Sequence, residues 1–133
     1  MSIYGAFDIS GSGLQAQRVR MDAISANLAN QDTPGYKMVQ VNFASGDGSG
    51  DETLGVHVAS IDRLDDFIPE IVPLGSPKDL AGDGVVDGIA QMPAFDYTVA
   101  MANGIEALRA YEANIQALET TRSMIDSAIR VLA

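Results

Sequence analysis

The last third of the chain carries a stripe at alternating spacings of three and four residues, and this stripe constrains the fold more than any other feature. Its members are Met101, Gly104, Leu108, Tyr111, Ile115, Leu118, Arg122, Ile125, Ile129 and Leu132. A stripe sustained over so many heptads, with Arg122 its one charged member, predicts a single long helix. Pro93 or Asp96 can begin that helix. It would be on the order of 55 Å long, so its partner surface must come from a second helix or from other chains.

A second helix is predicted near the N-terminus, from about Asp8 or Ser10 to about Asn30. Its stripe consists of Phe7, Ser10, Leu14, Gln17, Met21, Ile24 and Leu28. Gly11 and Gly13 are expected to weaken its first turn, because glycine costs roughly 0.5–1 kcal/mol relative to alanine in a helix. The expected helix is about 20 residues long, so it is too short to cover the whole C-terminal stripe. An uncovered apolar stripe of that extent marks an interaction surface.

A tight turn is predicted directly after the first helix. Asn30 suits the end of the helix, and residues 33–36 read Thr-Pro-Gly-Tyr. Proline presets φ at the second position of a turn, and glycine accepts a positive φ at the third. The chain is therefore expected to reverse at Pro34 and Gly35.

The middle of the chain has the composition of short strands and loops. Residues 38–43, 56–61 and 67–72 are rich in β-branched side chains, and the Gly/Asp/Ser-rich stretches 45–51 and 82–88 lie between or after them. Pro69 restricts the third run to an edge strand or an extended arm. Three weak strands are marginal alone, so the insert should lean on the helices or on neighbours.

The fold class predicted from these patterns is mainly α with a small β insert. The long N- and C-terminal helices are expected to pack as a coiled-coil-like α-helical core, with a loop- and β-rich middle segment. The predicted division is 1–37 for the first helix and turn, 38–93 for the insert and 94–133 for the C-terminal helix.

The charge of the chain narrows the classes of partner. Eighteen acidic and eight basic residues give a net charge of −10, and residues 31–93 contribute −8 of it. Nucleic acids and anionic membranes require a basic surface, so neither is expected as a partner. No apolar run is long enough to span a membrane, and the first residues lack the pattern of a cleaved signal peptide. The chain has no cysteine, which excludes disulfide and thiolate chemistry.

Two acidic or glycine-rich stretches resemble ion-binding loops only superficially. Asp79, Asp83, Gly84 and Asp87 could suggest a calcium loop, but Ala90 stands where the loop needs its bidentate ligand, which favours a solvated turn. The glycine-rich stretch 46–50 is not followed by the lysine and hydroxyl residue of a phosphate-binding loop.

The remaining candidates for catalysis are equally weak. His57 is the only histidine, and an alternating run favours a half-buried strand position for it. Asp62, Asp65 and Asp66 could be paired carboxylates, but their aspartate-rich, non-periodic surroundings favour a solvated loop. The sequence therefore predicts no enzyme activity and no cofactor, metal or small-molecule substrate.

Several motifs resemble those of a known family. Residues 25–30 read SANLAN and residues 32–37 read DTPGYK, and together they resemble the N-terminal signature of bacterial flagellar axial proteins, the rod, hook and hook-associated subunits. The opening FDISGSGL at 7–14, the tail YEAN at 111–114 and TTRSM at 120–124 look like the proximal rod proteins of the basal body. The segments 73–77, 84–86 and 92–93 are similar to the connecting segment of that family.

The resemblance implies a structural subunit of the periplasmic rod, which is needed for motility and is exported by the flagellar type III apparatus without a cleaved signal peptide. It implies partners among other copies of the chain, the proximal and distal rod subunits and the rod–ring junction protein. In this family the terminal helices pack in the tubular core and the middle segment lies outside it. Two alternatives stay open: another flagellar axial subunit, or a soluble coiled-coil adaptor or chaperone.

The two stripes and the turn define a predicted assembly interface. Its members are Leu14, Met21, Ile24, Asn27, Leu28, Asn30, Pro34, Gly35, Tyr36, Leu108, Tyr111, Asn114, Ile115, Leu118, Ile125, Ile129 and Leu132. Within this set, Asn27, Asn30 and the Pro34–Gly35 turn are expected to fix the reversal of the chain.

Overall fold

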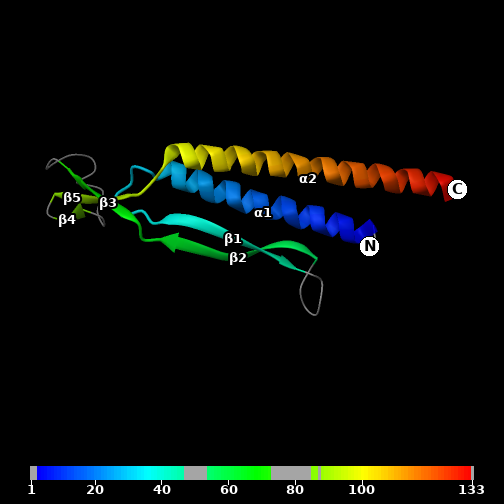
Figure 1. Cartoon of the computed structure of the whole chain (residues 1–133), viewed down its shortest axis with the longest axis horizontal. Helices are drawn as coiled ribbons and strands as arrows, with labels where there is room; N and C mark the ends of the chain where they lie inside the picture. The colour runs from blue at the N-terminus through cyan, green and yellow to red at the C-terminus, as the bar shows by residue number, and fades with distance from the viewer. Residues whose placement is uncertain (1–2, 47–53, 73–84, 87, 133) are drawn as a thin grey trace.

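Two long helices run side by side in opposite directions along most of the molecule (Figure 1). They are α1 (Ile3–Ala29) and α2 (Tyr97–Leu132), and the computed structural model describes residues 3–46, 54–72, 85–86 and 88–132. A β-hairpin lies along α1, and a small sheet lies beyond one end of the helix pair (Figure 1). The predicted fold class, mainly α with a small β insert, is confirmed.

Three close approaches fix the antiparallel register of the helices. A Cβ atom on Gly13 would lie 2.9 Å from Nδ2 of Asn114, and one on Gly104 would lie 3.8 Å from Cγ2 of Ile24. Between these two contacts, Arg20 Nη2 lies 3.9 Å from Glu106 Oε2. Each step toward the N-terminus of α1 is therefore a step toward the C-terminus of α2.

The first helix begins at Ile3, so the predicted start at Asp8 or Ser10 is wrong. Gly11 and Gly13 lie inside the helix instead of weakening its first turn. Packing explains the difference, because Gly13 has no side chain to separate α1 from Asn114. Tertiary contact thus outweighs the modest helix propensity of glycine.

The start of α2 follows the sequence prediction at Asp96. Its Oδ1 accepts hydrogen bonds from the backbone N–H groups of Thr98 at 2.9 Å and Val99 at 3.2 Å. A side-chain oxygen in this position satisfies backbone donors that have no partner within the helix. The helix therefore has a defined N-cap just after the insert.

The hairpin consists of β1 (Met38–Gly46) and β2 (Gly55–Leu64), and both strands extend beyond their predicted ranges. They pair antiparallel from Met38↔Leu64 to Gly46↔Gly55, with a register shift between Asn42 and Phe43. The hairpin contacts α1 along its length, so the predicted contact of the insert with a helix is confirmed.

The second sheet contains β3 (Phe67–Ile71), β4 (Val85–Val86) and β5 (Ile89–Pro93) in the order β3–β5–β4, all antiparallel. Pro69 lies in the edge strand β3, as predicted. A small core of Val72, Ala90 and Met92 holds this sheet together. The insert is therefore two separate sheets, and the two short strands β4 and β5 were not predicted.

None of the helices in the described part of the chain is both long enough and apolar enough to cross a lipid bilayer.

A matched pair of glycine substitutions tests how closely the hairpin approaches α1. Gly55 has φ of 116°, and a Cβ atom there would overlap Oγ of Ser12, whereas a Cβ atom on Gly11 meets nothing within 4 Å. We expect Gly55→Ala to lower the free energy of unfolding by about 1–3 kcal/mol, the usual range for backbone strain. Gly11→Ala should raise it by about 0.5–1 kcal/mol. Urea unfolding followed by circular dichroism measures both changes, and equal effects of the two variants would contradict the close approach.

Candidate assembly surfaces

The side chain of Asn27 joins the end of α1 to the start of the hairpin. Its Nδ2 donates a hydrogen bond to the carbonyl of Val39 at 2.8 Å, and its Oδ1 accepts one from the N–H of Val39 at 2.8 Å. The hydroxyl of Tyr36 also donates to Oδ1, at 3.2 Å. The amide thus pairs with the backbone of Val39 much as a neighbouring strand would.

The turn between α1 and β1 has the predicted geometry. The N–H of Tyr36 donates to the carbonyl of Thr33 at 3.2 Å, and Gly35 has φ of 74°. The N–H of Gly35 also donates to the carbonyl of Gln91 at 2.8 Å, which attaches the turn to β5. Asn30 closes the preceding helix, because its Nδ2 donates to the carbonyl of Ala26 at 2.8 Å.

A second polar contact holds the far end of the hairpin, and sequence reasoning missed it. Ser12 Oγ accepts a hydrogen bond from the N–H of Val56 at 3.1 Å and donates one to the carbonyl of Ile9 at 2.8 Å. A serine flanked by two glycines inside a helix is a weak signal of a closely approaching backbone. Nothing in its spacing indicates which strand approaches.

The predicted apolar stripe of α1 flanks the helix seam. Ile24 contacts Gly104 across the seam. Leu14, Met21 and Leu28 are half-buried. Because successive residues turn by about 100°, these three lie on the side of α1 away from Ser12 and Asn27, and therefore away from the hairpin.

The buried stripe of α2 differs from the predicted one. Its innermost residues are Ala107 and Thr121, and Gly13 backs onto Asn114 between them. Their small side chains allow a close approach of the helices, which turns the larger side chains outward. Of the predicted α2 positions, Tyr111, Ile115, Leu118 and Ile125 are half-buried, whereas Leu108 and Ile129 are exposed. The side chain of Leu132 lies outside the described residues.

Four large side chains form a continuous exposed row on the first turns of α2, which we term the α2 ridge. Their exposed fractions are 54% for Tyr97, 41% for Met101, 51% for Ile105 and 49% for Leu108. Spacings of four, four and three residues place them on one side of the helix. The ridge is an apolar surface that the described part of the chain leaves uncovered.

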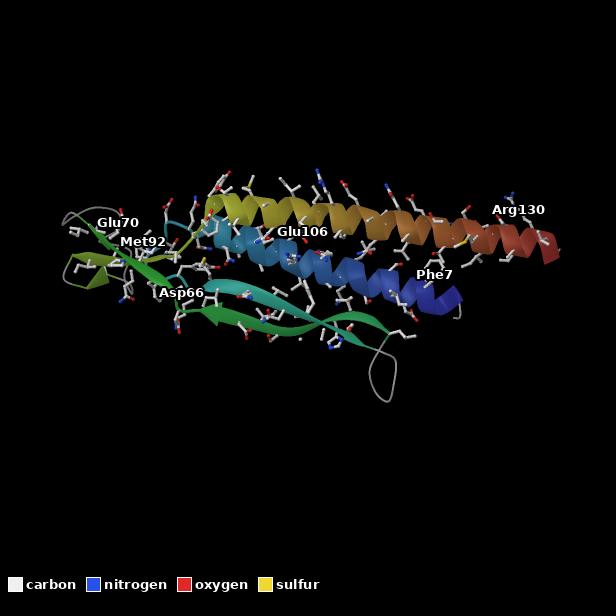
Figure 2. All side chains as sticks on the ribbon, in the orientation of Figure 1. Phe7, Asp66, Glu70, Met92, Glu106 and Arg130 are labelled. Carbon is white, nitrogen blue, oxygen red and sulfur yellow. The ribbon has the colours of Figure 1, made fainter. Side chains whose placement is uncertain are left out.

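The last two turns of α2 extend beyond the N-terminal end of α1 (Figure 1). Every described side chain from Asp126 to Val131 is exposed, and Figure 2 shows Arg130 well beyond Phe7. With 36 residues against 27, α2 is longer than α1, as the stripes predicted.

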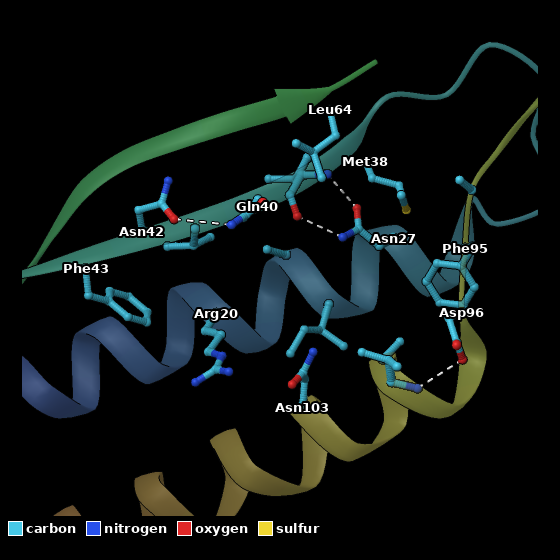
Figure 3. Close-up of a pocket in the computed structure, with 17 residues that line it drawn as sticks. Arg20, Asn27, Met38, Gln40, Asn42, Phe43, Leu64, Phe95, Asp96 and Asn103 are labelled. Carbon is cyan, nitrogen blue, oxygen red and sulfur yellow. Dashed lines mark hydrogen bonds between the residues drawn. The ribbon is translucent and has the colours of Figure 1, made fainter. Parts of the chain in front are cut away.

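A groove of about 660 Å³ opens between α1, β1 and the first turns of α2, and we term it the α1–β1 groove (Figure 3). It is lined by Arg20, Ala23, Ile24, Asn27, Met38, Val39, Gln40, Val41, Asn42, Phe43, Leu64, Ala94, Phe95, Asp96, Val99, Ala100 and Asn103. Most of these side chains are apolar, and small ones such as Ala23 and Ala100 leave room for a further element.

His57 is exposed on β2, opposite Ala44, so the prediction of a half-buried histidine is wrong. The sharp approach of β2 to α1 near Gly55 buries Val56 and Val58 partly and turns the intervening His57 outward. No cluster of three potential metal ligands occurs among the residues that the structure describes.

The candidate carboxylates do not converge on one site. Asp62 is an exposed residue of β2, not of a loop, and its Oδ2 accepts hydrogen bonds from Asn42 Nδ2 at 2.7 Å and Ser60 Oγ at 3.0 Å. Asp65 forms an ion pair with Lys37 at 2.6 Å. The residues considered as a calcium loop, 79, 83, 84 and 87, lie outside the described residues.

Comparison with known proteins assigns both helices to one class. Residues 7–37 match the family model described as "Flagella basal body rod protein", and residues 96–131 match the model described as "Flagellar basal body rod FlgEFG protein C-terminal". The two matches cover the reversal at Asn27 and nearly all of α2. The helix pair is thus that of a flagellar basal-body rod protein.

Relatives that span the whole chain define the family more narrowly. The chain is 37% identical over 131 residues to the flagellar basal-body rod protein FlgC of Yersinia enterocolitica, with 94% of each chain covered. It is 38% identical over 136 residues to FlgC of Agrobacterium fabrum, covering 96% of this chain and 93% of that one. FlgC of Bacillus subtilis is 29% identical over 153 residues, covering 98% and 99%. The chain belongs to the FlgC family of flagellar basal-body rod proteins, structural subunits of the rod.

Replacement of Asn27 tests the junction between α1 and the hairpin. Asn27→Leu leaves both the N–H and the carbonyl of Val39 without their partner. We expect the free energy of unfolding to fall by about 1–3 kcal/mol, the cost of partly buried unpaired groups. Urea unfolding measures the loss. The control is Gln40→Leu, because Gln40 is an exposed residue of β1 next to Val39. Equal stability of the two variants would contradict the assigned role of Asn27.

Proposed function

We propose that the chain polymerises with other rod subunits through its two terminal helices and that the α2 ridge is part of the interface. The observation that carries the proposal is the exposure of Tyr97, Met101, Ile105 and Leu108 in one row. Burying an apolar side chain of this size contributes roughly 1.5–3 kcal/mol. A row of four such side chains is a strong drive for association.

The predicted interface residues support this proposal to different degrees. Leu14, Met21 and Leu28 are half-buried beside the helix seam, so a neighbour packed on that side would complete their burial. Leu108 and Ile129 are exposed and can act only between subunits. Asn27, Asn30 and the turn act indirectly, since they fix the hairpin and leave the other side of the helices free.

The three segments 1–37, 38–93 and 94–133 have different proposed roles in the rod. The first and last segments form the assembly core, and the middle segment lies outside it. Residues 31–93 carry −8 of the net charge of −10, which suits a solvated position better than a packed helical core.

We place the assembled chain in the periplasmic section of the rod and infer that it reaches the rod through the flagellar type III apparatus, without a cleaved signal peptide. Its proposed neighbours are other copies and the proximal and distal rod subunits, together with the rod–ring junction protein. Membership of a rod family supports this location. We also propose that the chain has no catalytic role, because its relatives are structural subunits.

A charge introduced into the α2 ridge tests the proposal. Leu118 is half-buried beside α1, so a charge there would disturb the fold, whereas Leu108 is exposed. Leu108→Asp should prevent incorporation into basal bodies and abolish swimming, because a buried unpaired carboxylate is strongly unfavourable at an apolar interface. Export of the chain should continue. The measurements are immunoblots of purified basal bodies and of the exported fraction, together with swimming in soft agar.

Ala117→Asp is the matched control, because Ala117 is an exposed position of the same helix on the side opposite Leu108. It should be incorporated normally. Normal swimming of cells that carry Leu108→Asp would exclude the α2 ridge from the interface.

A further inference from the structure

We propose that the α2 ridge of one copy docks in the α1–β1 groove of a second copy. The inference rests on the proposed function and adds the identity and geometry of one contact. It assigns two different surfaces of the same chain to each other, so the contact is heterologous.

The ridge and the groove lie on nearly opposite sides of α2. The groove is lined from α2 by Val99, Ala100 and Asn103, whereas Met101 and Ile105 belong to the ridge. At about 100° per residue, Met101 and Asn103 point some 160° apart around the helix. One subunit can therefore fill the groove of a neighbour while its own groove receives the ridge of the next.

The two surfaces also lie at the same height along the molecule. Ile24 of the groove contacts Gly104 of α2, directly beside Ile105 in the ridge. Copies related by rotation about an axis parallel to the helices would therefore bring ridge and groove together with little axial shift. A heterologous contact of this kind generates a ring or an open helical tube.

The groove suits an apolar helix better than a polar small molecule. Of its polar side chains, Asn27 is bonded to Val39 and Asn42 to Ser60 and Asp62. Asp96 accepts a hydrogen bond from the backbone N–H of Val99 in the first turn of α2, as Figure 3 shows at the edge of the groove. Gln40 donates to Asn42, Arg20 is paired with Glu106, and Asn103 is the other polar residue of the lining. The remaining lining side chains are apolar, and an apolar helix face enters such a groove through residues spaced three and four apart. The ridge has that spacing.

The charged residues at the ends of the ridge and the groove support the same alignment of the two copies. Glu112 is exposed one turn beyond Leu108 and extends the ridge. Arg20 lines the groove at the corresponding end, and its contact with Glu106 is long, at 3.9 Å. In copies of equal polarity Glu112 approaches Arg20, which gives the neighbour a charge partner at the rim of the contact.

Disulfide trapping tests the contact, because the chain has no cysteine of its own. Ile105→Cys and Ala23→Cys place thiols on the ridge and in the groove at similar heights. Chains with one substitution each, carrying different tags, are produced together in motile cells, and basal bodies are isolated and oxidised. We expect a cross-linked dimer that contains both tags, and neither variant alone should give one. A chain with both substitutions should give a ladder of higher multimers.

Two controls keep the outcome interpretable. Ala117→Cys in place of Ile105→Cys should reduce the mixed dimer several-fold, because Ala117 is exposed on the side of α2 opposite Leu108. Met101→Cys with Val99→Cys is a second ridge and groove pair, at exposed positions where a small side chain does not disturb the fold.

Assembled rods without a mixed dimer from either pair would overturn the proposal. So would a dimer of two Ile105→Cys chains, which indicates a symmetric contact, or a bond from Ala23→Cys to a different protein. The proposed function is tested separately: if Leu108→Asp blocks incorporation while no cross-link forms, the ridge acts in assembly but meets another surface.

Discussion

The two-point bond between the side chain of Asn27 and the backbone of Val39 sets the arrangement of the whole molecule. It turns the chain from α1 into β1 within a few residues and starts the hairpin along α1. Ser12 holds the other end of the hairpin through Val56. Because both contacts join a side chain to the backbone, they fix the position of the hairpin while leaving its side chains free to vary.

The hairpin and α2 together occupy two sides of α1, and the consequence is a helix pair whose side away from the hairpin is uncovered. Small residues such as Gly13 and Ala107 bring α1 and α2 close together. The close approach leaves larger side chains outside the seam, including the α2 ridge. An isolated subunit therefore exposes apolar surface that a subunit in the rod can bury, which links the local packing to the capacity for assembly.

Much of the fold could be predicted from the sequence, because the spacing of apolar and turn-forming residues depends directly on the type of element that they form. The stripe on α2, the turn at Pro34–Gly35 and three of the strands follow from spacing, proline and glycine chemistry. The start of α1 could not be predicted, since the packing of Gly13 against Asn114 outweighs propensity. The rotation of α2 about its own axis, which decides which residues face α1, could not be predicted either. A stripe of large apolar residues does not show that small ones such as Ala107 will occupy the seam, and the contact of Ser12 with Val56 joins segments far apart in the sequence.

We propose that the side of the helices away from the hairpin, which is free in the single chain, is covered in the rod. It can be measured as the rate of maleimide labelling of Met101→Cys in the purified chain and in isolated basal bodies, relative to Ala117→Cys on the opposite side of α2. We expect fast labelling of Met101→Cys in the purified chain, because this position is exposed there, and strong protection in basal bodies. Equal labelling of Met101→Cys in the two states, with the rod intact, would contradict it.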